Sequence, residues 1–250
     1  MRTKLTRREC LLGGISFVAG TGAFKFAGFA SKAVQGSVSG YSEAIRRSIV
    51  KIVIKSEPSG FGTGFCIARD KDSAECVIAT ASHVVDGGRI DSLVADPASH
   101  VVLARDGSSD IMRRGWCQEK WMDICAFHSQ LKLQPLELAD ELPAIGETIY
   151  AVGFTEDDSY EVNIGSFSDL IVSGSFRFTT TSRAVPGMSG GPILNSRGQV
   201  VGMVVTGSHQ GNLAGAVPLH ELQNLRERMR FVDRADSLHK TQTPKTTGIK

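Results

Sequence analysis

Residues 187–192 read Gly-Met-Ser-Gly-Gly-Pro, a serine surrounded by glycines and followed by a proline. Glycine, serine and proline also build ordinary turns, so these six residues leave two interpretations of Ser189, a turn tip or a nucleophile. The next residues, Pro192–Asn195, begin an apolar run that predicts a strand. Ser189 therefore lies in a loop that leads into a β-strand, and its role depends on the rest of the chain.

The body of the chain is a succession of short β-type runs, rich in Val, Ile, Phe and Thr and bounded by Gly, Asp, Asn or Ser. Examples are IVKIVIK (49–55), ECVIAT (75–80), ETIYAVGF (147–154) and QVVGMVVTG (199–207). Many short strands separated by turns predict an all-β sandwich or barrel, and the sequence lacks the long helical patterns of a parallel α/β sheet. One helix is expected at 218–230, where Leu219, Leu222, Leu225 and Met229 share a face.

A composition break at 138–147 divides this body into two parts of similar size. We expect an N-terminal β-barrel at 41–140 and a C-terminal β-barrel with its helix at 141–231. The remaining residues, 232–250, are polar and aperiodic, and we expect this tail to be disordered.

The first residues have the features of an export signal. A basic segment (1–9) precedes an apolar run (11–24) that is too short to span a bilayer comfortably, and small residues follow. We expect 1–33 to be an export signal and the mature protein to be periplasmic or secreted. The pair Arg7-Arg8 also resembles the twin-arginine export motif, with a general secretory signal or an uncleaved membrane anchor as alternatives.

Composition narrows the classes of function. The net charge is +2, and the positive surplus lies in the first thirty residues, so the body offers no basic surface for nucleic acid. Outside the signal, the spacing of the cysteines is wider than zinc sites favour. The four cysteines could form two disulfides or remain as four buried thiols. No metal or cofactor is expected. These cysteines are Cys66, Cys76, Cys117 and Cys125.

The stretch around Ser189 fits the pattern G-x-S-x-G, which two catalytic architectures share. In an α/β-hydrolase the serine precedes a helix, and the acid and the histidine follow it in the chain. Here Pro192 opens a strand and too few residues follow. In the other architecture a histidine and an aspartate precede the serine, as His83 and Asp123 do here.

The motifs in this order resemble the chymotrypsin-fold (trypsin-like) serine proteases, in the compact bacterial form of the HtrA/DegP protease domain. GFGTGFCIA (60–68) is similar to the family's G-x-G-F strand, and ATASHVV (79–85) to T-A-A-H-V-V, with Ser82 replacing an alanine. DICAF (123–127) is similar to D-L-A-V-L, and GMSGGPILNSRGQVVGM (187–203) to the nucleophile loop and its hairpin. The resemblance covers about 45–230 and implies two six-stranded antiparallel β-barrels with a C-terminal helix.

The resemblance also implies the roles of the site residues. Ser189 would be the nucleophile, His83 the general base, and Asp123 the carboxylate that holds the imidazole. The backbone N–H groups of Gly187 and Ser189 would form the oxyanion hole.

Two other aspartates, Asp106 and Asp110, also lie between His83 and Ser189. They belong to a turn-like stretch, RDGSSDI (105–111), whereas Asp123 leads an apolar strand as the family pattern requires. We therefore expect Asp123 to be the partner of His83.

Met188 stands where relatives commonly carry Asn or Asp. An aspartate there can pair with a new N-terminus during zymogen activation, which methionine cannot do. We expect no such ion pair, and removal of the signal should not itself be an activation step. No segment after the helix resembles a PDZ domain, so no PDZ-mediated partner is expected.

Substrate preference is the least readable property. By position, Arg183 would lie near the base of the pocket for the P1 side chain, the residue before the cut. An inward Arg183 would favour acidic P1 side chains, and an outward one would decide nothing. Val204, Val205 and Thr206 along the pocket wall would favour small or apolar ones.

We expect an exported serine endopeptidase that cleaves proteins or peptides through an acyl-enzyme. A protease-fold binding protein with an unused triad is the alternative from a different class, and an esterase is a third possibility because the same acyl chemistry handles esters.

Overall fold

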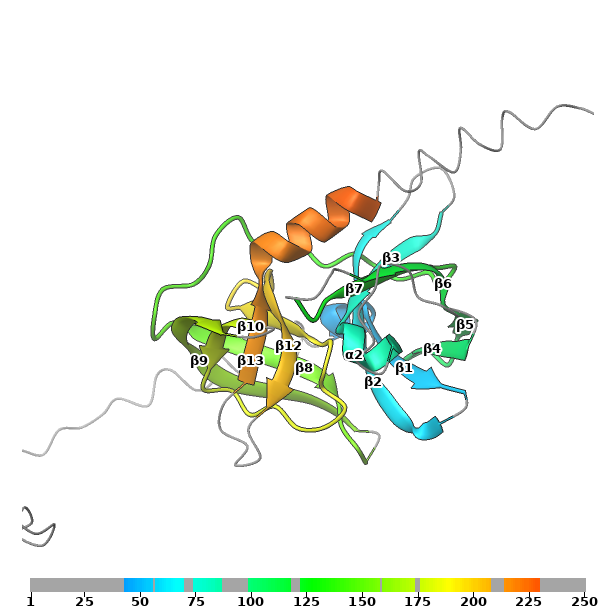
Figure 1. Ribbon diagram of the computed structural model, residues 1–250, viewed down its shortest axis with the longest axis horizontal. Helices are drawn as coiled ribbons and strands as arrows, with labels where there is room; N and C mark the ends of the chain where they lie inside the picture. The colour runs from blue at the N-terminus through cyan, green and yellow to red at the C-terminus, as the bar shows by residue number, and fades with distance from the viewer. Residues whose placement is uncertain are drawn as a thin grey trace, which may run out of the picture. The chain divides into compact units, whose positions relative to one another are not determined.

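The computed structural model describes residues 43–55, 57–69, 74–86, 99–117, 122–157, 159–173, 176–207 and 214–229 (Figure 1). All of them belong to one compact unit, Val38–Lys250. The other unit, Met1–Ser37, and the segment 232–250 lie outside the described residues, and so do the predictions of an export signal and a disordered tail.

The N-terminal half is a seven-stranded antiparallel sheet in the order β5-β4-β1-β2-β3-β7-β6. A short helix at 43–46 precedes it, and α2 (Ser82–Asp86) follows β3. The strands are β1 (Ile49–Ile54), β2 (Glu57–Arg69), β3 (Cys76–Thr80), β4 (His100–Ala104), β5 (Ser109–Ile111), β6 (Arg113–Cys117) and β7 (Cys125–Ser129).

The prediction of a closed six-stranded N-terminal barrel needs correction, because the sheet is a half-barrel. Its two edge strands, β5 and β6, are consecutive in the chain and are separated by the buried residue Met112 alone. A one-residue connection is too short for a hairpin, so these two strands do not pair with each other. The chain bends at Met112 and brings the two edges of the curled sheet to the same place.

The C-terminal half is a closed barrel of six antiparallel strands, as predicted, in the order β10-β13-β12-β11-β8-β9. The helix at 219–229 follows β13 directly (Figure 1), and its four predicted apolar positions are all buried. The all-β prediction is thereby confirmed. The strands are β8 (Thr148–Phe154), β9 (Tyr160–Ser173), β10 (Phe176–Thr180), β11 (Pro192–Asn195), β12 (Val200–Gly207) and β13 (Ala214–Pro218).

The four cysteines of the N-terminal half are free thiols, and all are buried. Cys117 lies directly opposite Cys125 in the β6–β7 ladder, and Cys66 contacts Cys76. The hydrogen bond with Cys76 and burial both raise the pKa of the Cys66 thiol, so this thiol is protonated at neutral pH. The sequence allowed either two disulfides or four buried thiols, and the structure contains the four buried thiols.

Thr63 in β2 joins the two halves. Its hydroxyl donates to the carbonyl of Gly187 (2.7 Å) and accepts from the backbone N–H of Phe154 (3.0 Å). Its own N–H donates to the carbonyl of Ser189 (2.8 Å), and its carbonyl accepts from the hydroxyl of Thr80 (2.8 Å). Thr63 is fully buried, so all four hydrogen bonds are shielded from water.

A second contact between the halves surrounds Tyr160 of β9. The guanidinium groups of Arg46 and Arg105, both from the N-terminal half, lie over its ring at 4.9 and 5.8 Å from the ring centroid. Phe154 packs edge-on against the same ring, with 5.9 Å between centroids. Burial raises the pKa of the Tyr160 phenol, so the ring acts as a neutral platform for the two cations.

We predict that Thr63→Val destabilises the fold and Thr63→Ser does not do so to the same degree. Valine has a similar shape but no hydroxyl, and it leaves the Gly187 carbonyl and the Phe154 N–H without their buried partner. This should lower the free energy of unfolding by about 1–3 kcal/mol. Serine keeps the hydroxyl and loses one methyl group, worth about 0.8 kcal/mol. Urea unfolding checks both variants, and equal losses would show that the hydroxyl is not what joins the halves.

Candidate active site

His83 is held at the surface by buried neighbours. It is the second residue of α2, which follows the fully buried strand β3. Val84 and Val85 are buried and anchor α2, whereas the His83 side chain remains 40% exposed. The two buried valines after His83 fix α2 against the sheet, and the imidazole is therefore exposed to solvent.

Asp123 faces this imidazole from the segment before β7. Its neighbours Met122 and Ile124 are buried, and its own carboxylate is 15% exposed. One carboxylate oxygen, Oδ2, lies 2.5 Å from His83 Nδ1. The other, Oδ1, accepts from the His83 backbone N–H (3.0 Å) and from the Ser82 hydroxyl (2.7 Å).

The pKa of Asp123 follows from two opposing effects. Burial by itself would raise it, because a charged carboxylate loses hydration. The hydrogen bonds and charge of His83 and the hydroxyl of Ser82 outweigh burial and lower the pKa below its ordinary value of 3.8. The carboxylate is therefore ionised at neutral pH, which is the state that orients an imidazole.

The two rival aspartates have structural partners instead. Asp106 lies in the exposed turn between β4 and β5, where its carboxylate accepts from the N–H (2.9 Å) and the hydroxyl of Ser108. These two bonds lower the pKa of Asp106. This is a local side chain to backbone turn of the kind that Asp commonly makes.

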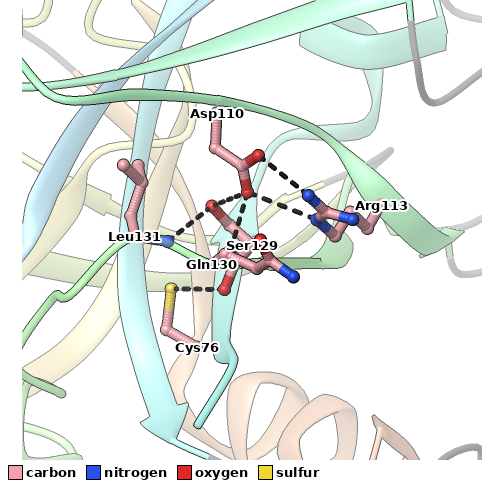
Figure 2. A network of polar contacts seen from close by, with 6 residues as sticks. All are labelled: Cys76, Asp110, Arg113, Ser129, Gln130 and Leu131. Atoms are coloured by element: carbon pink, nitrogen blue, oxygen red, sulfur yellow. Dashed lines mark hydrogen bonds and ion pairs between the residues drawn. The ribbon is translucent and has the colours of Figure 1, made fainter. Parts of the chain in front are cut away.

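Asp110 ties three segments of the N-terminal sheet together (Figure 2). Its Oδ2 accepts from the Ser129 hydroxyl (3.0 Å) and from the Gln130 N–H (2.7 Å), and its Oδ1 accepts from Arg113 (3.3 Å). Burial would raise the pKa of Asp110, but these bonds lower it. The position of Asp110 in β5 thus serves the joint between β5, β6 and the end of β7.

Two glycines let the Ser189 loop approach His83. A Cβ at Gly190, which has φ +83°, would collide with the carbonyl of Thr63 and with Thr80 Oγ1, and would lie 2.8 Å from Ala81 N. A Cβ at Gly62 would lie 2.5 Å from Val84 Cγ2 and 3.1 Å from the Ser189 carbonyl. The loop therefore packs on the junction of β3 and α2, which carries the imidazole. Among the hydrogen bonds of the described residues, none joins the Ser189 hydroxyl to the His83 ring.

The backbone of the loop leaves two N–H groups available. The N–H groups of Met188, Gly190 and Gly191 donate to the carbonyls of Val185 (3.1 Å), Val204 (2.7 Å) and Met188 (2.9 Å). Within the described part of the chain, the N–H groups of Gly187 and Ser189 donate to no acceptor. Gly187 has φ +94°, a backbone angle that glycine adopts without strain. Two donors on alternate residues beside a serine are the arrangement that binds an oxyanion.

Met188 in the Ser189 loop is fully buried. Its sulfur lies 3.5 Å from Nδ2 of Asn163, and a Cβ at Gly153 would lie 3.0 Å from its Cα. The same Asn163 amide donates to the Arg183 carbonyl (3.2 Å). Sequence reasoning did not identify Asn163, because an asparagine within a strand carries no motif.

The four residues predicted to line a substrate pocket separate into two pairs. Val204 and Val205 are buried, and Val204 pairs with Gly191 of the nucleophile loop through its N–H and with Gly190 through its carbonyl. Arg183 and Thr206 are exposed. Their roles in substrate selection remain predictions.

The described residues contain no cluster of three His, Cys, Asp or Glu side chains arranged to bind a metal ion. Of the helices in the described ranges, none has the length and apolar content that a bilayer crossing requires.

Solved structures share this fold. The Rv3671c protease of M. tuberculosis, in its inactive form, is 20% identical with a TM-score of 0.60, and the match covers 77% of this chain and 93% of that one. The HtrA-type protease AlgW, solved with a tripeptide, is 18% identical with a TM-score of 0.59, covering 75% and 62%. These likenesses confirm the chymotrypsin-like fold.

The family is shown by the sequence itself. The model of the trypsin-like peptidase domain matches residues 62–203, and the chain belongs to that family. Two proteins of Synechocystis sp. that are named as serine proteases are also similar. HhoA is 31% identical over 158 residues, 58% of this chain, and HhoB is 28% identical over 184 residues, 68% of this chain. The matches span 36% and 40% of the length of those two proteins.

We predict that Asp110 contributes to stability in a pH-dependent way. Because its folded pKa is lowered, the contribution is present above the ordinary value of 3.8 and is lost as the pH falls through the folded pKa. Asp110→Asn should lower the free energy of unfolding at pH 7 by about 1 kcal/mol, a low value because the carboxylate is partly solvated. Unfolding curves measured from pH 7 to pH 3 should converge with those of the wild type in acid. A constant difference across this range would contradict the prediction.

Proposed function

We propose that this protein is a serine endopeptidase whose catalytic triad is Ser189, His83 and Asp123. The observation that carries the proposal is the pairing of an exposed imidazole with a largely buried, ionised carboxylate, beside a serine loop with two backbone N–H groups that have no acceptor among the described residues. Membership of the trypsin-like peptidase family supports the same reaction.

Asp123 fixes the tautomer of His83. Its Oδ2 accepts a hydrogen bond from the Nδ1–H of the ring, so Nε2 carries the lone pair and can act as a base. The proton on Nδ1 is assigned from this hydrogen bond, because an ionised carboxylate can only accept. A weakly nucleophilic hydroxyl requires such a base at neutral pH.

In the first half of the reaction, Ser189 Oγ bonds to the carbonyl carbon of the substrate and His83 Nε2 takes the hydroxyl proton. The resulting oxyanion accepts hydrogen bonds from the N–H groups of Gly187 and Ser189. The carbon–nitrogen bond then breaks, and His83 passes its proton to the leaving amine. The product of this half-reaction is an acyl-enzyme on Ser189.

In the second half, water takes the place of the amine. His83 accepts a proton from the water as its oxygen bonds to the acyl carbon, and it then returns a proton to Ser189 Oγ as the acid is released. The His83 imidazole transfers every proton in both halves, and water is the reactant that releases the acid.

The substrates in this proposal are proteins or peptides, and the protein acts after export through the signal at 1–33. The domains would be 41–140, which contains the N-terminal half-barrel sheet, and 141–231, which contains the closed barrel and its helix. The burial of Met188 beside Asn163 supports the expectation that no ion pair with a new N-terminus forms the active site. A protein from which the signal is absent should then be active without a defined mature N-terminus.

A fluorophosphonate probe that reacts with activated serines tests the proposal. We expect the wild type to be labelled and to cleave a diverse peptide library, and Ser189→Ala to do neither. His83→Ala should lower kcat by about 10⁶-fold because no base remains, and Asp123→Asn by about 10⁴-fold because the imidazole takes the wrong tautomer. The matched carboxamide variant Asp110→Asn should keep its activity, since Asp110 serves the sheet.

The same experiment decides between the competing functions. A well-folded wild type that is not labelled would indicate a protease-fold binding protein. Labelling with hydrolysis of esters but of no peptide in the library would indicate an esterase. Equal activity of Asp123→Asn and the wild type would overturn the assignment of Asp123.

A further inference from the structure

Ser82 has a contact that the proposed triad does not use. It is the first residue of α2, next to His83 in the chain, and 4% of it is exposed. Its hydroxyl donates to Asp123 Oδ1 at 2.7 Å, within the range of a charge-assisted hydrogen bond. In the motif that ATASHVV (79–85) resembles, an alanine occupies this position and could make no such bond.

We propose that Ser82 is a positioning residue, whose hydroxyl holds the Asp123 carboxylate in the orientation that His83 requires. This inference rests on the proposed function of the His83–Asp123 pair.

The two oxygens of the Asp123 carboxylate have different partners. Oδ2 belongs to the imidazole at 2.5 Å, and Oδ1 belongs to Ser82 and to the His83 backbone N–H. Three donors around a planar group restrict its rotation about the bond that joins it to Cβ. Without the hydroxyl, Oδ1 would keep a single backbone donor at 3.0 Å, and the plane of the carboxylate would be less constrained.

The charge of the site gives a second reason. The Asp123 side chain is largely removed from water, so its negative charge requires fixed dipoles in place of hydration. Ser82 supplies such a dipole on the oxygen that the imidazole does not use. Since Ser82 and His83 are adjacent in α2, one short helix carries all three donors to the Asp123 carboxylate.

The Ser82 hydroxyl and the His83 backbone N–H belong to consecutive residues, so few bonds separate the two donors. The Ser82 hydroxyl and the His83 N–H converge on the same oxygen, while the His83 ring reaches around to the other. A carboxylate held at both oxygens by two consecutive residues has one preferred orientation. We infer that the alanine-to-serine difference adds a constraint that the resembled motif lacks.

The test compares Ser82→Ala with Ser82→Thr, which keeps a hydroxyl. Ser48→Ala is the matched control, because Ser48 is also a buried serine of the N-terminal half, and its hydroxyl bonds to the Ala44 carbonyl (3.4 Å) away from the site. We expect Ser82→Ala to lower kcat about tenfold with KM unchanged within about twofold, as loss of one hydrogen bond to a charged group predicts. Ser82→Thr should restore most of kcat, and Ser48→Ala should leave it unchanged.

A spectroscopic measurement makes the test independent of catalysis. The Nδ1–H proton of His83, shared with Asp123, gives a low-field NMR resonance that can be followed in the Ser189→Ala background. We expect Ser82→Ala to shift or broaden this resonance, and Ser82→Thr and Ser48→Ala to preserve it. An unchanged resonance and an unchanged kcat in Ser82→Ala would overturn the inference, as would an equal loss of kcat in Ser48→Ala.

The two proposals fail in different ways. If the wild type shows no Ser189-dependent hydrolysis, the proposed function fails, and the resonance still decides whether Ser82 positions the carboxylate. If the wild type is active and Ser82→Ala is indistinguishable from it by both measurements, the role of Ser82 alone is wrong.

Discussion

The hydrogen bonds of Thr63 are the interaction on which the arrangement of the site depends. They connect β2 of the N-terminal half with the carbonyls of Gly187 and Ser189, and they continue to Thr80 at the end of β3. Since β3 leads into the helix of His83, the buried Thr63 fixes the positions of both the histidine and the serine loop relative to β2. The proposed catalysis would tolerate little displacement of these groups, because a shift of about 1 Å can cost on the order of 10²-fold in rate.

Close packing at two glycines also fixes the position of the serine loop relative to the N-terminal half. Gly62 and Gly190 lie where a side chain would collide with Val84 or with the backbone of Thr63, so the two halves approach at a distance that only glycine allows. The N–H groups of Met188, Gly190 and Gly191 bond to backbone carbonyls, whereas those of Gly187 and Ser189 have no acceptor among the described residues. The glycines of the nucleophile loop thus serve packing as well as backbone conformation.

The three aspartates show why residue type alone does not define a role. Asp106, Asp110 and Asp123 all have lowered pKa values, and all accept hydrogen bonds from serine. Asp106 closes a turn, Asp110 joins strands of the half-barrel, and Asp123 alone of the three contacts the His83 ring. From the sequence, Asp123 was preferred because it leads an apolar strand, whereas Asp106 and Asp110 lie in a turn-like stretch. The structure places Asp110 not in a turn but in the short strand β5.

The sequence by itself determined the all-β class, the C-terminal helix and the candidates His83, Asp123 and Ser189, since these depend on local patterns of apolar residues and on motif order. It did not determine that the N-terminal sheet would be a half-barrel, which results from the single residue between β5 and β6. It also gave no signal for Thr63 as the link between the halves, because its hydroxyl and the Gly187 carbonyl are 124 residues apart. Likewise, Ser82 stood out as a departure from the motif, but only the tertiary structure placed its hydroxyl on Asp123. A hydrogen bond between distant segments depends on how the strands pack, and no local pattern in the chain encodes that geometry.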